Sequence, residues 1–400
     1  MNVISPAFRH LLTPLAVASI LAIGCGSSGS EDSDGDSRSC ITIESSDELI
    51  GGASLDDDCY EIATLLTVDD GAIAIHADTT LYFNEGAGLS IEGSARLDVS
   101  AGAETPAVLR GDESQRGRWR GIYLGSPGPH HIEGLHLHDA GGDNWAGQPH
   151  LARGGIVIGS DDATVEVVDS HFENNEYAAI TSATAEASIE LSQNHFHNND
   201  YPLRLHGNHL GGIDSDNGFA DNRTNVILVH TDEAVTSQAS WSALEIPYQI
   251  EEALPIRRLV TIEPQTTLSF EQHAGLDVDG GSLHIDAAGD EPVRFVGVSD
   301  TPGYWRGLRF RNTPPAGNVL TNIEVHHAGS ERWNQSWGNS QAAILVDEEG
   351  FLDLNDALIA HSDYHGISVR EALLVGCDDI RFESNHRHNQ HSYDDDETCF

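Results

Sequence analysis

The pentapeptide His171–Asn175 (HFENN) recurs as His195–Asn199 (HFHNN) and again as Gly218–Asn222 (GFADN), at a spacing of about 24 residues. Short apolar segments such as Leu203–Leu205 follow the copies. Alternating apolar and polar residues are typical of β-strands, and helical spacing is nearly absent from the chain. Short strands that repeat at a long fixed period predict an all-β solenoid, in which each coil stacks its strands in parallel on the previous coil.

The paired asparagines of these repeats are predicted turn positions. Asn174-Asn175 and Asn198-Asn199 end two of the pentapeptides, and Asp221-Asn222 ends the third. Asparagine tolerates the left-handed backbone conformation, and its amide can form a ladder with the same residue in the next coil.

A longer repeat divides the chain into two homologous halves at an offset of about 187 residues. The segment 79–93 recurs as 266–280, and Trp119–Ile122 recurs as Trp305–Leu308. We therefore expect one half at 40–222 and a second, continuous with it, at 223–400.

This pattern resembles the right-handed parallel β-helix superfamily, the fold of pectate lyases and of many secreted bacterial repeat proteins. It looks most like bacterial lipoproteins of that group, over about residues 40–390. The resemblance implies a single-stranded, right-handed parallel β-helix with internal duplication. It implies no single activity, because the superfamily contains lyases, hydrolases, adhesins and inert scaffolds.

The N-terminus is predicted to be a lipoprotein signal. Its apolar run, Leu11–Ile23, is too short to span a bilayer and matches the core of a signal peptide. The run ends in Ala22-Ile23-Gly24-Cys25, which resembles a bacterial lipobox with Ala22 where that family prefers leucine. We expect a signal peptide at 1–24 and lipidation at Cys25. An ordinary secretory signal is the alternative.

The segment after Cys25 is expected to be a flexible Gly/Ser/Asp tether at 25–39, because it has almost no apolar residue to bury. By the sorting habit of lipoproteins, Gly26 favours the outer membrane. The expected location is therefore the bacterial cell envelope, lipid-anchored, at the surface or in the periplasm. A chain without the lipid would be secreted.

Cysteine usage indicates the same oxidising compartment. The sequence has 5 cysteines, and four remain once Cys25 is assigned to the lipid. They form one close pair near each end, Cys40 with Cys59 and Cys377 with Cys399, which we predict to be disulfides. Zinc binding is the competing interpretation, but the chain has no Cys-x-x-Cys spacing.

The charge balance excludes nucleic acid as a partner. Lys+Arg is 20 and Asp+Glu is 64, so the formal net charge is -44, and there is no lysine. Phosphate binding needs clustered basic residues. Acidic turns could hold calcium, although no EF-hand loop is present. Among the 22 histidines, His136 and His138 would share one side of a strand, but we interpret them as neutral polar residues and predict no metal site.

Catalytic residues are not evident. A polysaccharide lyase needs a basic residue, and Arg120 and Arg306 occupy equivalent places in the two halves, which favours a structural role. Paired carboxylates for a hydrolase fall at turns or in the tail. We therefore expect a protein that is more a binder than an enzyme. A polysaccharide lyase or glycoside hydrolase with a cryptic site is the alternative.

Two polar loops that interrupt the coil period carry tryptophan, which commonly stacks on sugar rings. The alternative is that each tryptophan folds back over its own coil, and Trp119 and Trp305 are expected to be structural. The function predicted is a non-catalytic scaffold or glycan-binding adhesin. Its candidate ligand-binding residues are Trp145, Asn144 and His138 in the first half and Trp333, Trp337, Asn334 and His326 in the second.

Overall fold

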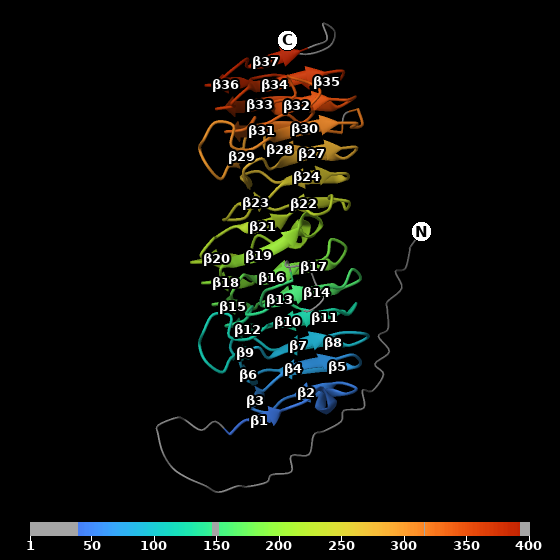
Figure 1. Ribbon diagram of the computed structural model, residues 1–400, viewed down its shortest axis with the longest axis vertical. Helices are drawn as coiled ribbons and strands as arrows, with labels where there is room; N and C mark the ends of the chain where they lie inside the picture. The colour runs from blue at the N-terminus through green and yellow to red at the C-terminus, as the bar shows by residue number, and fades with distance from the viewer. Residues whose placement is uncertain (1–38, 146–151, 316, 393–400) are drawn as a thin grey trace, which may run out of the picture.

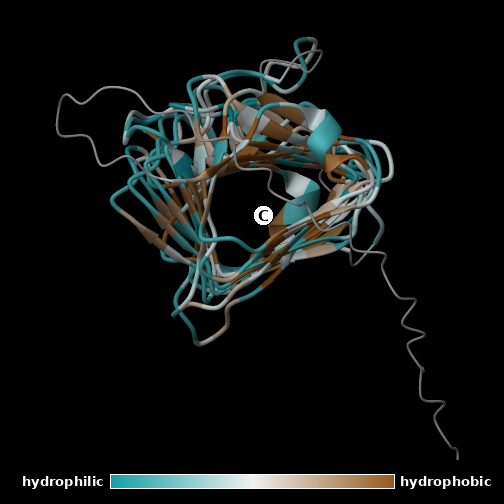
Figure 2. Ribbon diagram, turned by 90° about the horizontal axis from the view of Figure 1, so that it is seen from below, coloured by the Kyte–Doolittle hydropathy of each residue, from teal (hydrophilic) through white to brown (hydrophobic). Residues whose placement is uncertain are grey.

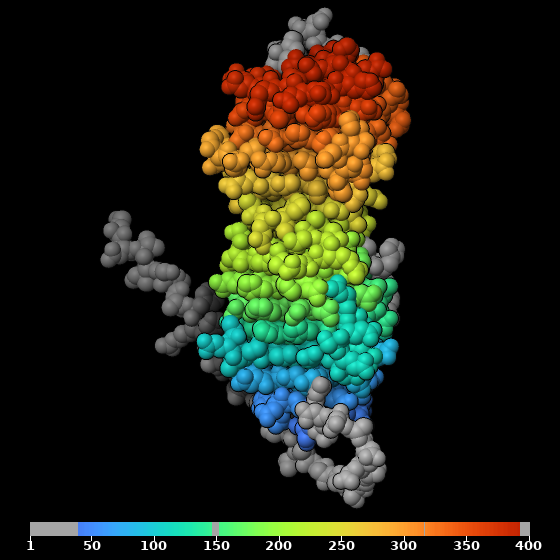
Figure 3. Space-filling model, turned by 90° about the vertical axis from the view of Figure 1, so that its left-hand side faces the viewer, coloured from blue at the N-terminus to red at the C-terminus, as the bar shows by residue number. Residues whose placement is uncertain are grey.

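A computed structural model describes residues 39–145, 152–315 and 317–392. The chain winds into a rod whose coils are stacked in the order of the sequence, as the colour bands of Figures 1 and 3 show. The ladders between its strands are parallel, and they join each coil to the next. The predicted all-β parallel β-helix is confirmed.

Two sheets form faces of the first half. Sheet 1 is 8-stranded, and sheet 2 is 6-stranded. Sheet 1 contains β1 (Ile41–Ile43), β3 (Cys59–Ile62), β6 (Thr80–Phe83), β9 (Ala107–Gly111), β12 (Leu135–His138), β15 (His171–Glu173), β18 (His195–His197) and β20 (Gly218–Ala220). Sheet 2 contains β2 (Ala53–Leu55), β5 (Ala72–His76), β8 (Arg96–Ser100), β11 (His130–Glu133), β14 (Thr164–Val168) and β17 (Ser188–Ser192).

Sheet 3 runs through both halves of the rod. Its first-half strands are β4 (Leu65–Val68), β7 (Gly88–Ile91), β10 (Ile122–Leu124), β13 (Ile156–Ile158), β16 (Ala178–Ser182), β19 (Tyr201–His206) and β21 (Ile227–His230). It continues through β22 (Ala239–Trp241), β23 (Tyr248–Ile250), β25 (Leu259–Ile262), β26 (Thr267–Phe270), β28 (Ser282–Asp286), β29 (Val293–Gly297), β31 (Val319–His326), β33 (Phe351–Ala360), β35 (Leu373–Gly376) and β36 (Arg381–Glu383).

Sheet 4 belongs to the second half alone and is 6-stranded. Two short 3-10 helices, η1 (Ser46–Leu49) and η2 (Gly207–Gly212), complete the described regular structure. No helix among the described residues is long and apolar enough to cross a membrane. The strands of sheet 4 are β24 (Ala253–Ile256), β27 (Gly275–Asp279), β30 (Gly307–Arg311), β32 (Ala342–Asp347), β34 (His365–Arg370) and β37 (Gln390–Ser392).

The core fills the inside of the coil, around which the strands form the walls (Figure 2). Because side chains alternate along a strand, every second residue points inward. In sheet 1 the register aligns Phe172, Phe196 and Phe219, whose rings stack with centroids 5.1 and 5.4 Å apart. Identical residues therefore lie above one another, and each coil covers the apolar surface of the coil below.

The asparagine turns behave as predicted. Asn174 and Asn198 have φ of 57° and 54°, in the left-handed region. The asparagine after each is buried and forms a ladder. The amide of Asn199 donates to the side-chain oxygen of Asn222 at 3.0 Å, and its own oxygen accepts from the amide of Asn175 at 2.8 Å. Each amide also satisfies backbone groups at the corner of its coil.

The duplication is reproduced in atomic detail. Trp119 stacks on Phe83 and Trp305 stacks on Phe270, each with ring centroids 4.0 Å apart. Each indole donates a hydrogen bond of 2.7 Å to a backbone carbonyl, that of His138 for Trp119 and of His326 for Trp305. Both tryptophans are fully buried. Their predicted structural role is confirmed.

Equivalent strands of the two halves nevertheless belong to different sheets. β6 lies in sheet 1 and its duplicate β26 in sheet 3, while β7 lies in sheet 3 and β27 in sheet 4. Sheets 1 and 2 end at β20 and β17, and only sheet 3 crosses between the halves, through β19, β21 and β23. The second half is therefore stacked on the first with its sheets shifted by one ladder.

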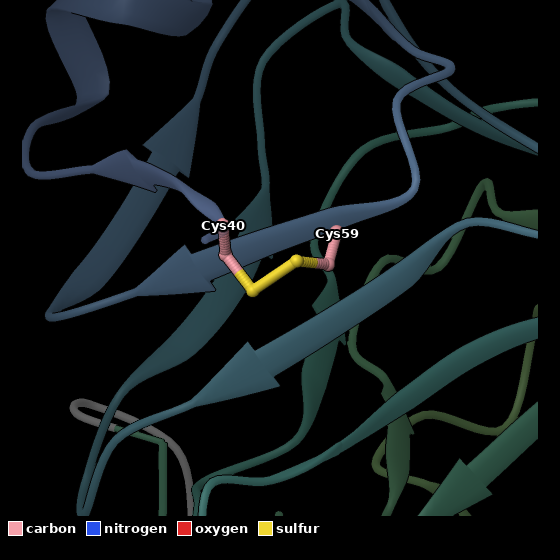
Figure 4. Close-up of a disulfide and its surroundings, with 2 residues drawn as sticks. All are labelled: Cys40 and Cys59. Atoms are coloured by element: carbon pink, nitrogen blue, oxygen red, sulfur yellow. A yellow bond between two sulfur atoms is a disulfide. The ribbon is translucent and has the colours of Figure 1, made fainter. Parts of the chain in front are cut away.

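One of the two predicted disulfides is present. Cys40 and Cys59 are bonded next to the paired strands β1 and β3 (Figure 4). Cys377 follows β35, but Cys399 lies outside the described residues, so the second bridge stays a prediction. Cys25 and the 25–39 tether, apart from residue 39, also lie outside them.

Breaking the first disulfide is expected to loosen the first coil. The bridge closes a loop with a sequence separation of 19, and the chain-entropy model gives about 3 kcal/mol for such a loop. A Cys40→Ser/Cys59→Ser variant should therefore exchange the amide hydrogens of β1 and β3 about 100-fold faster. Amides of β16, far along the rod, are the internal control. Unchanged exchange at β1 would contradict this prediction.

Candidate functional site

Trp145 lies flat against the coil instead of projecting from it. It is only 4% exposed, and its ring stacks with that of Tyr123 at 5.3 Å. The guanidinium of Arg120 lies 5.4 Å from the ring centroid and 3.7 Å from the carboxylate of Asp143. Gly88 makes room for this packing, because a Cβ there would lie 3.2 Å from the indole.

The second half repeats this arrangement around Trp333. Arg306 covers the indole at 4.9 Å and pairs with Glu331. A Cβ at Gly275 would lie 3.0 Å from the ring, so glycine again makes room. Glycine, arginine, tryptophan and an acidic residue thus form one duplicated unit. The arginine gains both a cation–π contact and an ion pair.

The remaining loop residues serve mostly local structure. Trp337 is 6% exposed and lies 5.0 Å from the guanidinium of Arg370. The side-chain oxygen of Asn334 accepts from the backbone N–H of Ser336 at 2.9 Å, which fixes the turn. Asn144 is exposed.

The structure therefore shows the tryptophans folded back over their own coils, which was the alternative interpretation. Trp333, at intermediate exposure, presents more surface than the buried Trp145 and Trp337. Sequence alone missed the partner of each ring, because Arg120 and Arg306 precede their tryptophans by about 25 residues. Ligand binding by these loops stays a prediction.

A row of histidines lies on the outer face of sheet 1, the side of the rod that faces the viewer in Figure 3. The phenylalanines of β15 and β18 point inward, so the residues beside them point outward. The rings of His136, His171 and His195 follow one another on neighbouring strands, with centroids 4.5 and 4.7 Å apart. Gly218 occupies the next place, so the row of rings ends there.

A second row runs beside the first and alternates imidazole with carboxylate. Nδ1 of His138 lies 3.4 Å from the carboxylate of Glu173, and Nε2 of His197 lies 3.1 Å from that of Asp221. His138, a predicted site residue, thus belongs to this face, whereas Trp145 packs on Tyr123 of sheet 3. His326 has a similar partner in the second half, since its Nε2 lies 3.4 Å from Glu324.

Burial keeps much of this face uncharged. Desolvation lowers the pKa of His136 below its usual value, and the neighbouring His138 lowers it further. Desolvation also lowers the pKa of His171, together with its neighbours His136 and His195. These imidazoles are neutral at pH 7, and a neutral imidazole both donates and accepts a hydrogen bond.

A groove of about 410 Å³ opens where sheet 1 ends. The side chains of Gly218 and Ala220 are too small to fill the place that histidines occupy on the strands before. Glu245 comes from the next coil, and its carboxylate accepts the backbone N–H of Phe219 at 2.8 Å. The groove is lined by His171, Phe172, Glu173, His195, Phe196, His197, Gly218, Phe219, Ala220 and Glu245.

Sequence analysis quoted the repeats that form this groove but did not assign it a function. The signal was available, because histidines that flank an inward phenylalanine in successive repeats must share the outer face. The position of Glu245 gave no such signal, since it comes from a coil that has no strand at that place.

Comparison with protein-family models, with curated proteins and with solved structures found no match to this chain.

Proposed function

We propose that this protein is a non-catalytic scaffold or glycan-binding adhesin, held in the bacterial cell envelope by a lipid on Cys25. The observation that carries the binding role is the groove on sheet 1. Its walls repeat the same kinds of hydrogen-bonding group from strand to strand, at the spacing of about 4.8 Å that strands adopt. A polysaccharide is also a repeating chain and can engage several rungs at once.

The chemistry of the groove favours a neutral polysaccharide. Sugar hydroxyls both donate and accept hydrogen bonds, as do the neutral imidazoles of His171 and His195. The carboxylates of Glu173 and Glu245 add acceptors. A formal net charge of -44 repels anionic polymers at neutral pH.

A binding role without cleavage agrees with the composition of the groove. Its lining residues include no arginine, and the chain has no lysine, so a lyase would lack its usual base there. The resemblance to envelope β-helix lipoproteins supports the same proposal. A glycoside hydrolase that used the groove carboxylates is the competing function, and product analysis separates the two.

The test is binding to an array of neutral and acidic polysaccharides. A His195→Ala/His197→Ala variant should bind at least about tenfold more weakly, because it removes two groove side chains without touching the core. The matched control is His284→Ala, which removes an outward histidine of β28 on another sheet.

Each outcome of this test assigns the site. Loss of binding in the groove variant alone, without new reducing or unsaturated ends from the wild type, supports the proposal. Loss in a Trp333→Ala variant alone moves the site to the tryptophan loop. Cleavage products overturn the non-catalytic function, and absence of binding to any array member overturns the glycan-binding role.

A further inference from the structure

Three histidines meet near the C-terminal end of the rod. His365 begins β34, His391 lies in the neighbouring strand β37, and His388 lies in the connection just before β37. The ring centroids are 5.3 Å apart for His365 and His388, 4.8 Å for His365 and His391, and 6.2 Å for His388 and His391. The rings therefore form a triangle instead of a row.

The central ring of this triangle lacks hydrogen bonds. His365 is 2% exposed, and neither Nδ1 nor Nε2 has a hydrogen-bond partner. A buried polar atom without a partner is costly, and native structures contain few of them. An imidazole nitrogen whose lone pair is unused in a buried place is a suitable metal ligand.

The dimensions of the triangle match a metal bound by three histidines. Zinc binds imidazole nitrogen at about 2.0–2.1 Å with tetrahedral geometry, which places the ring centroids about 5 Å apart. Two of the three observed separations agree with this value, and the third is longer by about one ångström. Sites with three histidines keep water in the fourth position.

We propose that His365, His388 and His391 bind a divalent metal ion of the zinc type. Among the described residues no three metal-binding side chains already converge on one point, so closure requires rotation of the rings. His388 is exposed, and its ring can turn without displacing core residues. The movement needed is that of side chains, while the strands stay in place.

A neighbouring side chain supplies the outer hydrogen bond that metal-binding histidines usually have. The amide of Asn339, at the end of the Trp337 loop, lies 3.2 Å from Nε2 of His391. With the amide oxygen turned toward it, Nε2–H donates, and Nδ1 becomes the coordinating atom. Such a partner fixes both the tautomer and the direction of the ring.

The other histidine groups fit a shared ion less well. His136, His171 and His195 follow one another on three successive strands, so the outer two are separated by the middle one. His327 and His361 are stacked face to face, with an interplanar angle of 12°. Only the C-terminal triangle places three rings around one centre.

The test is titration of the full chain with Co²⁺ and Zn²⁺ at pH 7.5. Tetrahedral Co²⁺ absorbs strongly in the visible range, and Zn²⁺ should displace it. We expect one such site per chain, and we expect His388→Ala to weaken zinc binding by about 100-fold. His386→Ala is the matched control, since this exposed histidine lies two residues away and pairs with Asp363.

The possible results separate clearly. Loss of the cobalt spectrum in His388→Ala and its retention in His386→Ala support the site. An octahedral spectrum, or equal binding in both variants, overturns it. Loss only in a His171→Ala variant would place the metal on sheet 1 and overturn the C-terminal assignment. Both His388→Ala and His386→Ala change exposed residues, so folding should be preserved in either.

Discussion

Replacing Asn199 with alanine is expected to lower the free energy of unfolding by about 4 kcal/mol. The side chain of Asn199 is fully buried, and its amide donates to the carbonyl of Phe172 at 2.9 Å and to Asn222 at 3.0 Å. Its oxygen accepts from both the backbone and the side chain of Asn175, at 3.1 and 2.8 Å. Alanine would leave these groups unpaired in the core, at about 1–3 kcal/mol each before any water enters.

The adjacent Asn198 provides the matched control for this prediction. It holds the left-handed turn with φ of 54°, which glycine adopts without strain. Asn198→Gly should therefore cost less than about 1 kcal/mol, although it also removes a side-chain contact with Arg116. Urea unfolding measures both variants. Equal destabilisation would mean that the turn, and not the ladder, supplies the stability.

Acidification is expected to destabilise the junction between the two halves. His209 in η2 and His230 at the end of β21 are buried, and their ring nitrogens lie 3.1 and 3.0 Å from the hydroxyl and the carbonyl of Ser182. Burial lowers the pKa of each to about 3, and the charges of Arg204 and His206 lower that of His230 further.

The direction of the pH effect follows from proton binding. Below pH 6.5 the unfolded chain protonates both histidines, whereas the folded chain does so only near pH 3. The unfolded state thus binds more protons between these values, and stability falls as the pH falls. At pH 5 the two histidines together should reduce the free energy of unfolding by about 4 kcal/mol relative to pH 7.5.

A double variant isolates this contribution. In His209→Asn/His230→Gln, the amides can keep hydrogen bonds to Ser182 but do not titrate. The loss of stability between pH 7.5 and pH 5 should shrink by about the same 4 kcal/mol. His284→Ala, an outward histidine, should leave the loss unchanged. An identical pH dependence in the double variant would show that other groups control acid stability.

The coil, its corners and the duplication could all be predicted from sequence. The reason is that a solenoid repeats local rules: Phe172, Phe196 and Phe219 must point inward together, and each asparagine pair must turn the chain. Trp119 and Trp305 were also interpretable, because they occupy the same place in both halves. These features depend on contacts between residues one coil apart, which a period of about 24 residues displays directly.

The sites depended on information that the period does not contain. Trp145 and Trp333 were expected to be candidates for open platforms, but arginines from the preceding coil cover them. His388 and His391 crowd the C-terminus in the sequence, yet nothing there places His365 between them. Side chains from different coils meet at angles around the axis that repeat spacing alone does not fix.

By itself, the sequence determined an acidic, all-β solenoid of two related halves, because stacking of like residues is a local and periodic effect. Only the tertiary structure decided that sheet 3 alone joins the halves, that sheet 1 ends at Gly218 in an open groove, and that three histidines form a triangle at the far end. The shift of one ladder at the junction is set by how η2 and β22 pack on β17, a contact that occurs once and leaves no repeat to read.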